Sequence, residues 1–138
     1  MKIYFAITIQ GDRSRLEHAK RLLGLLEEKN HTVLTKHIFH EDVLEHENEE
    51  KPEDIFLRDM QWLQEADIVI VEASGSSFGI GFETGYVLGA LNKPLYLLYD
   101  RSVEKKISKM ATGLLDENCT KIAYDKFEEV LKFFEKEL

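Results

Sequence analysis

One glycine-rich segment carries the residues best suited to chemistry. Residues 72–85 read Glu-Ala-Ser-Gly-Ser-Ser-Phe-Gly-Ile-Gly-Phe-Glu-Thr-Gly, which places Glu83 just inside an expected helix. Free backbone N–H groups at the start of that helix, with the hydroxyls of Ser76 and Ser77, could hold an anion. Gly79 removes side-chain bulk, so that a ligand can approach the backbone closely. Alternatively, Glu83 only complements the helix dipole, as acidic residues in a first turn often do.

Three known motifs can be tested on this segment. A P-loop needs a Gly-Lys-Ser/Thr ending, but no lysine occurs between Lys51 and Lys93. The dinucleotide-binding fingerprint needs a glycine where the chain has Thr84, and it follows the first strand of its fold rather than the third. The nucleophile elbow of serine hydrolases does match around Ser77, but its histidine must follow the serine, and all 5 histidines precede Ser77. None of these motifs explains the segment.

A second carboxylate lies upstream of this segment. Asp59 falls within an expected helix, where an isolated aspartate is most often a solvated residue. Two carboxylates that converge on one pocket would instead suit glycosidic chemistry, because one can attack or stabilise the anomeric carbon while the other handles protons or orients the sugar. Asp59 and Glu83 are therefore the candidate pair.

The histidines are a further candidate cluster. His37, His40 and Glu41, followed by His46, could suggest a metal site. Their spacing matches no defined set of metal ligands, and segments rich in glutamate and histidine are usually solvated. We therefore expect no bound metal.

Hydrophobic periodicity predicts the elements that position these residues. Expected strands are 2–9, 32–36, 67–71, 94–99 and 120–124. Expected helices are 12–29, 52–65, 103–112 and 126–138, with one more that follows the loop 74–81 and runs to about residue 91. Residues 37–51 are polar and predict an exposed loop or irregular helix. Asp12 or Ser14 is expected to cap the first helix, and Phe56 and Leu63 are expected to face the core.

The alternation of strands and helices predicts one α/β domain over residues 1–138. Five strands should form a parallel sheet with helices on both faces. In such sheets, ligands bind beyond the carboxyl ends of the strands, where the strand order reverses. The loops that follow residues 9, 36, 71 and 99 are therefore the expected site.

Composition excludes several functional classes. The 138 residues carry a formal net charge of −8, which opposes binding to nucleic-acid polymers but not to a small phosphorylated ligand. Cys119 is the only cysteine, so no intrachain disulfide can form. The apolar N-terminal run is too short for a membrane span and lacks a signal-peptide cleavage site. We expect a cytoplasmic protein without membrane contacts.

Five segments together carry a resemblance to a known family. They are residues 59–85, Ile-Tyr-Phe-Ala at 3–6, Leu-Thr-Lys-His at 34–37, Lys-Pro at 93–94 and Ile-Ser-Lys-Met at 107–110. The chain resembles the 2′-deoxynucleoside 5′-monophosphate N-hydrolases of the nucleoside 2-deoxyribosyltransferase superfamily. This resemblance implies a flavodoxin-like Rossmann fold of three layers, a homodimer, no metal or organic cofactor, and cleavage of the bond between deoxyribose and base.

The resemblance also implies roles for individual residues. Glu83 resembles the nucleophile that attacks C1′ and forms a covalent glycosyl-enzyme. Asp59 resembles the carboxylate that contacts the sugar and assists proton transfer, and Tyr4 the tyrosine that orients the nucleophile and crowds the 2′ position. Ser77 and, from the partner subunit, Ser108 resemble phosphate ligands. The other expected substrate contacts are Ile7, Thr8, Ile9, Gln10, Gly11, Arg13, His37 and Gly79.

The loop after the first strand departs from the family pattern. Where the family commonly has Gly-Ser-Ile-Arg-Gly, residues 7–11 read Ile-Thr-Ile-Gln-Gly. Gln10 thus replaces a phosphate-facing arginine, and Arg13 is the candidate to compensate.

The expected reaction is hydrolysis of deoxynucleoside 5′-monophosphates to free base and deoxyribose 5-phosphate. A deoxyribosyltransferase that passes the sugar to another base, and a non-catalytic nucleotide-binding module, remain alternatives. The sequence stops soon after its last expected helix, without the longer C-terminal tail of the transferases, which favours hydrolysis.

Overall fold

Five parallel strands form the centre of the computed structural model, which describes all 138 residues. They are β1 (Lys2–Ile7), β2 (Thr32–Val33), β3 (Ile68–Glu72), β4 (Leu95–Asp100) and β5 (Cys119–Tyr124). Their spatial order is β2-β1-β3-β4-β5, the order of flavodoxin-like sheets. The predicted α/β fold with a five-stranded parallel sheet is confirmed.

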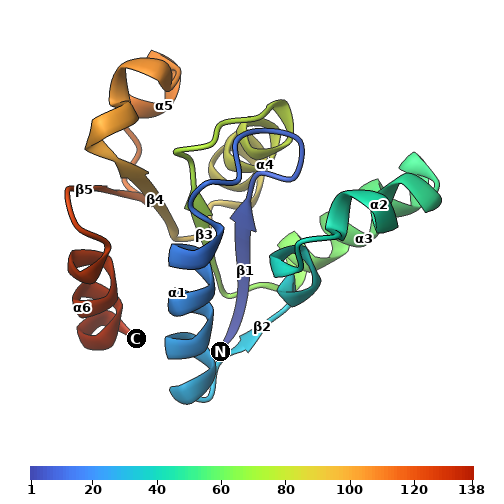
Figure 1. Ribbon diagram of the computed structural model, residues 1–138, viewed down its shortest axis with the longest axis horizontal. Coiled ribbons are helices and arrows are strands. Elements are labelled where there is room, and N and C mark those ends of the chain that lie inside the picture. The colour runs from blue at the N-terminus through green and yellow to red at the C-terminus, as the bar shows by residue number, and fades with distance from the viewer.

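Helices cover both faces of the sheet (Figure 1). One face packs against α1 (Leu16–Glu28) and α6 (Phe127–Glu137). The other packs against α3 (Pro52–Glu65) and against α4 (Phe78–Tyr86), which continues as the π-helical turn η2 (Val87–Leu91). The remaining helical segments are η1 (Lys36–Phe39), α2 (Val43–Glu49), η3 (Arg101–Lys106) and α5 (Lys109–Thr112). None of the helices combines the length and apolar composition needed to cross a membrane.

Burial in the sheet follows from this three-layer arrangement. β3 pairs with β1 on one side and with β4 on the other, and all five of its residues are buried. A strand covered on both faces needs apolar side chains at successive positions, which explains the run Ile-Val-Ile-Val in β3. In α1, by contrast, apolar side chains recur at helical spacing, so that Leu22 and Leu26 are fully buried while the opposite face is exposed.

Side-chain hydrogen bonds explain where two predicted boundaries were wrong. β2 ends at Val33 rather than at residue 36, because the Thr35 hydroxyl pairs with β1 in place of the backbone. It accepts from Phe5 N at 3.1 Å and donates to Phe5 O at 2.6 Å. The first helix begins at Leu16, and neither Asp12 nor Ser14 caps it. The Asp12 carboxylate instead accepts from the backbone N–H of Ser14 at 2.9 Å, forming a turn before the helix.

The segment between β2 and α3 is more ordered than its polar sequence predicts. Residues 37–51 contain most of η1 and all of α2, and Ile38, Phe39 and Val43 are buried. Within α3, Leu63 faces the core as predicted, but Phe56 does not and is 52% exposed. In Figure 1, α2 and α3 extend to the right, away from the strands and on the side of β2.

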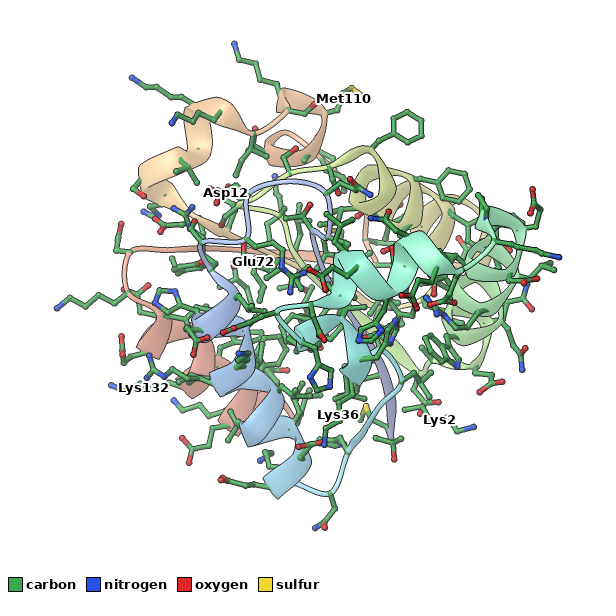
Figure 2. All side chains as sticks on the ribbon, turned by 45° about the vertical axis from the view of Figure 1, so that its right-hand side comes forward. Lys2, Asp12, Lys36, Glu72, Met110 and Lys132 are labelled. Carbon is green, nitrogen blue, oxygen red and sulfur yellow. The ribbon has the colours of Figure 1, made fainter.

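A buried carboxylate anchors the loop between β3 and α4. Glu72 is only 1% exposed and lies in the interior of the molecule (Figure 2). It accepts hydrogen bonds from Ser74 N at 2.7 Å and from the Tyr124 hydroxyl at 2.8 Å. The Ser74 hydroxyl in turn accepts from Asp100 N at 2.8 Å. These bonds join the carboxyl ends of β3, β4 and β5 and fix the direction in which the chain leaves β3.

The substitution Tyr124→Phe tests this anchor. It leaves a buried oxygen of Glu72 without a donor, so we expect the free energy of unfolding to fall by about 1–3 kcal/mol. Urea denaturation at neutral pH measures the change. Tyr96→Phe is the matched control, because Tyr96 packs on Phe133 and Phe134 and its hydroxyl makes no hydrogen bond. Equal effects of the two substitutions would contradict the assignment.

Candidate active site

A cavity of about 250 Å³ lies at the carboxyl end of β1, beside the start of α4. β1 lies between β2 and β3, so the cavity is at the reversal of strand order where ligands of such sheets bind. Its walls come from β1 and the loop that follows, from η1, α2 and α3, and from the first turns of α4. Three predicted catalytic residues, Tyr4, Asp59 and Glu83, all line it.

Tyr4 and Glu83 are joined directly. The Tyr4 hydroxyl donates a hydrogen bond to Glu83 Oε1 at 3.1 Å. Tyr4 lies within β1 and is buried, while Glu83 projects from α4 at the cavity wall. Because β1 is held by neighbours on both sides, this bond gives the carboxyl group a fixed position relative to the sheet.

Burial sets the acid–base properties of the pair. It raises the pKa of Glu83 to about 7; the hydrogen bond from Tyr4 opposes the rise, and the charges of Asp59 and Glu47 add to it. Burial and the negative charges of Glu83 and Asp59 also raise the pKa of Tyr4, so its hydroxyl remains a protonated donor. The Glu83 carboxyl therefore exchanges between acid and carboxylate near neutral pH.

Asp59 is oriented by its neighbour on α3. Arg58 Nε donates to Asp59 Oδ1 at 3.1 Å, and Arg58 Nη1 donates to Glu50 Oε2 at 3.0 Å. The guanidinium also lies 5.0 Å from the centre of the Trp62 ring, within the range of a cation–π contact. Burial raises the pKa of Asp59, whereas the charge and hydrogen bond of Arg58 lower it. Asp59 therefore has a cationic partner, unlike Glu83.

Close packing of two loops fixes the part of the cavity wall at the start of α4. Asp12 N donates to Gly75 O at 3.3 Å, and a side chain at Gly75 would collide with the backbone of Asp12. At the start of α4, the Ser77 hydroxyl caps the helix by accepting from Ile80 N at 3.4 Å. Ser77 and Gly79 both line the cavity.

The structure brings many of the predicted site residues together. Those that line the cavity are Tyr4, Ile7, Ile9, Gln10, Asp59, Ser77, Gly79 and Glu83.

Arg13 lies behind the cavity wall instead. Its guanidinium donates to the carbonyl oxygens of Thr8, Ile38 and His40 at 2.9–3.0 Å, so it ties the loop after β1 to η1.

Thr8, Gly11 and His37 are also predicted site residues that do not line the cavity. Thr8 is buried, and its hydroxyl accepts from Gly11 N at 2.7 Å. His37 packs against Trp62, with 5.4 Å between the ring centres. The neighbouring histidines form no metal centre with it, because no group of three or more histidine, cysteine, aspartate or glutamate side chains is arranged to hold a metal.

Ser108 lines a second cavity, of about 260 Å³, which also contains Ser77, Ile80 and Met110. This cavity lies between α4 and α5, and Ser77 contributes to both cavities. The Ser108 hydroxyl accepts from Met110 N at 3.2 Å.

The predicted site residues leave out seven residues that line the first cavity, among them three from helical segments that precede β3. Ile38, Glu47 and Ile55 line the cavity, and they come from η1, α2 and α3. Glu47 lies in a segment with many acidic residues, and nothing in its sequence context distinguishes it from the others. Only the packing of α2 against η1, which brings Glu47 to the cavity, selects it.

Two substitutions should move the pKa of Glu83 in opposite directions. Tyr4→Phe removes a hydrogen bond that stabilises the carboxylate, so the pKa should rise above about 7. Asp59→Asn removes a neighbouring negative charge, so the pKa should fall. Carboxyl ¹³C NMR titration measures both shifts, and Glu53→Gln, at the exposed start of α3, is the control. Shifts of equal sign in the two variants would show that these contacts do not set the pKa.

The chain is similar to known proteins over nearly its whole length. The family model for nucleoside 2-deoxyribosyltransferase matches residues 3–131. A protein of Thermofilum pendens, provisionally named 2′-deoxynucleoside 5′-phosphate N-hydrolase 1, is 40% identical over 96% of this chain and 91% of its own. The 5-hydroxymethyl-dUMP N-hydrolase of Esox lucius is 35% identical over 94% of this chain and 90% of its own.

A solved structure shares the fold at lower sequence identity. The CMP N-glycosidase of Clostridium botulinum superimposes with a TM-score of 0.75 over 100% of both chains, at 21% identity. The sequence relatives and the family model each cover nearly the whole chain. The protein described here therefore belongs to the nucleoside 2-deoxyribosyltransferase family.

Proposed function

We propose that this protein hydrolyses the N-glycosidic bond of 2′-deoxynucleoside 5′-monophosphates, releasing the base and deoxyribose 5-phosphate. The observation that carries the proposal is the Glu83 carboxyl, held by Tyr4 at 3.1 Å in a cavity that Asp59 also lines. The names of its relatives, which are N-hydrolases of deoxynucleotides, support the same class of reaction.

The reaction has two steps. The Glu83 carboxylate attacks C1′, the C1′–N bond breaks, and its electron pair leaves with the base, which takes a proton from Asp59. Water then attacks C1′ of the glycosyl-enzyme, gives a proton to Asp59 and restores the Glu83 carboxylate. Burial raises the pKa of Asp59, which is the direction that suits its first role as an acid.

The 2′-deoxy sugar is the substrate best matched to this site. It lacks the electron-withdrawing 2′ hydroxyl that destabilises positive charge at C1′, so one carboxylate is enough to drive departure of the base. Tyr4, bonded to the nucleophile, takes up the space beside it and disfavours a substituent at the 2′ position.

The 5′-phosphate would bind at the start of α4. Ser77 and Gly79 line the cavity there, and the positive end of the helix dipole favours an anion. Gln10 on the opposite wall can donate a hydrogen bond but supplies no charge.

A second subunit would complete the phosphate site with its Ser108. Large apolar side chains project from this side of the molecule: Phe78 is 92% exposed, and Met110 stands at its edge (Figure 2). Phe56 and Phe82, both exposed, line a common hollow with Phe78, and their ring centres are 6.5 Å apart. An apolar surface of this kind is typical of a subunit interface, which supports a homodimer.

The decisive test is incubation with the four deoxynucleoside 5′-monophosphates, with and without a second free base, followed by chromatography. We expect release of free base, with a bell-shaped dependence of the rate on pH, because the first step needs Glu83 ionised and Asp59 protonated. Glu83→Ala should lower the rate at least about 1,000-fold. Glu53→Ala on exposed α3 is the control. Release that survives Glu83→Ala would overturn the mechanism, and base exchange faster than hydrolysis would identify a transferase.

Mixed dimers test the shared site. A Ser108→Ala chain and a Glu83→Ala chain, each weakly active alone, should regain activity when refolded together, because one site of each mixed dimer then has both residues. Random mixing predicts about a quarter of the wild-type activity. Activity equal to the mean of the two separate variants would show that Ser108 does not act across an interface.

A further inference from the structure

Glu47 is a third carboxylate in the cavity, and the proposed mechanism does not use it. It projects from α2 and lines the cavity together with Asp59 and Glu83. Its side chain is only 13% exposed, and its Oε1 atom is buried without a hydrogen-bond donor. A buried acceptor without a donor is costly, so the site is suited to a ligand that supplies one.

Arg58 does not meet this need. Its Nη2 atom lies 3.7 Å from Glu47 Oε1, beyond hydrogen-bond distance, and Nη2 is itself buried without a partner. The hydrogen bonds of Arg58 go to Glu50 and Asp59 instead. The Arg58 guanidinium thus faces three carboxylates. Arg13, the other cation that acts on Glu47, gives its hydrogen bonds to backbone carbonyl oxygens and not to the Glu47 carboxylate.

The walls near Glu47 suit a flat aromatic ring. Ile7 and Ile9 line the cavity from β1 and its following loop, while Ile38 and Ile55 line it from η1 and α3. Ligand sites commonly combine apolar walls of this kind with a few polar groups that fix orientation. The four isoleucines would pack on the faces of a nucleobase, and the Glu47 carboxylate would bind a polar group on its edge.

The proposed function sets the orientation of the nucleotide in the cavity, and the inference below rests on that proposed function. With the phosphate at Ser77 and Gly79 and the sugar at Glu83, the base points away from α4 toward the remaining wall. That wall contains the isoleucines and Glu47.

We propose that Glu47 accepts a hydrogen bond from the amino group of the nucleobase, so that the substrates are deoxynucleotides of cytosine, adenine or guanine. A carboxylate accepts well from an amino group, as in recognition of the cytosine N4 amino group by acidic side chains. Uracil and thymine instead present two carbonyl oxygens on either side of one N–H, and these oxygens repel a carboxylate.

Matched nucleotide pairs test the assignment. dCMP carries an amino group where dUMP carries a carbonyl oxygen, and dAMP and dIMP differ in the same way. We expect kcat/KM to favour the amino member of at least one pair about 10-fold, and Glu47→Gln to reduce this preference about 10-fold or more, because an amide can donate to the oxygen. Glu45→Gln, an exposed residue of the same helix, should keep the wild-type ratio. An unchanged ratio in Glu47→Gln, for both pairs, would overturn the inference.

Binding separates this inference from the proposed function. Calorimetry with Glu83→Gln, alone and combined with Glu47→Gln, gives the Kd ratio of each pair without turnover. If the wild type releases no base, the proposed function fails, but a Kd ratio that depends on Glu47 still supports the inference. Equal affinities within each pair, or no binding of any nucleotide, would overturn it.

Discussion

The hydrogen bond between Tyr4 and Glu83 is the interaction on which the site depends. It connects the central part of the sheet to the helix that carries the nucleophilic candidate, with 3.1 Å between hydroxyl and carboxyl oxygens. Burial alone would drive Glu83 toward its neutral form, and the Tyr4 hydroxyl counters this by stabilising the carboxylate. The same contact thus sets both the position and the ionisation of the group. It requires β1 to lie beside β3 and α4 to follow β3 closely, which the strand order provides.

Rigid loops are what allow α4 to begin at the correct place. Glu72 binds the backbone of Ser74 and the hydroxyl of Tyr124, and Gly75 packs directly on the loop after β1. Directly after Gly75, Ser76 has a φ of 46°, a left-handed conformation that residues other than glycine rarely adopt. Such a conformation persists only where the surroundings enforce it, so the anchors that precede Ser76 account for it. The start of α4 is therefore preorganised for a ligand.

The fold could be predicted from the sequence because its signals are local and repeated. The run of apolar residues in β3 reflects burial on both faces of the strand, and the helical spacing of apolar residues in α1 reflects burial on one face of the helix. Glu83 and Asp59 could be selected because glycines and a family pattern surround them. The early end of β2, by contrast, depends on the Thr35 side chain meeting a strand about 30 residues away. Glu47 was missed for a similar reason, since only tertiary packing distinguishes it from its acidic neighbours.

The carboxylates of the cavity act as one coupled group rather than as separate sites. The charges of Asp59 and Glu47 both raise the pKa of Glu83, so a full set of negative charges is disfavoured and protons are retained within the cavity. A proton on Asp59 would therefore favour the ionised form of Glu83, which is the distribution that the first step of the proposed reaction needs. A base amino group bound to Glu47 would act in the same direction, because it offsets part of that negative charge and lowers the pKa of the nucleophile. Recognition of the base and activation of Glu83 would then be linked by electrostatics alone, without any movement of the chain.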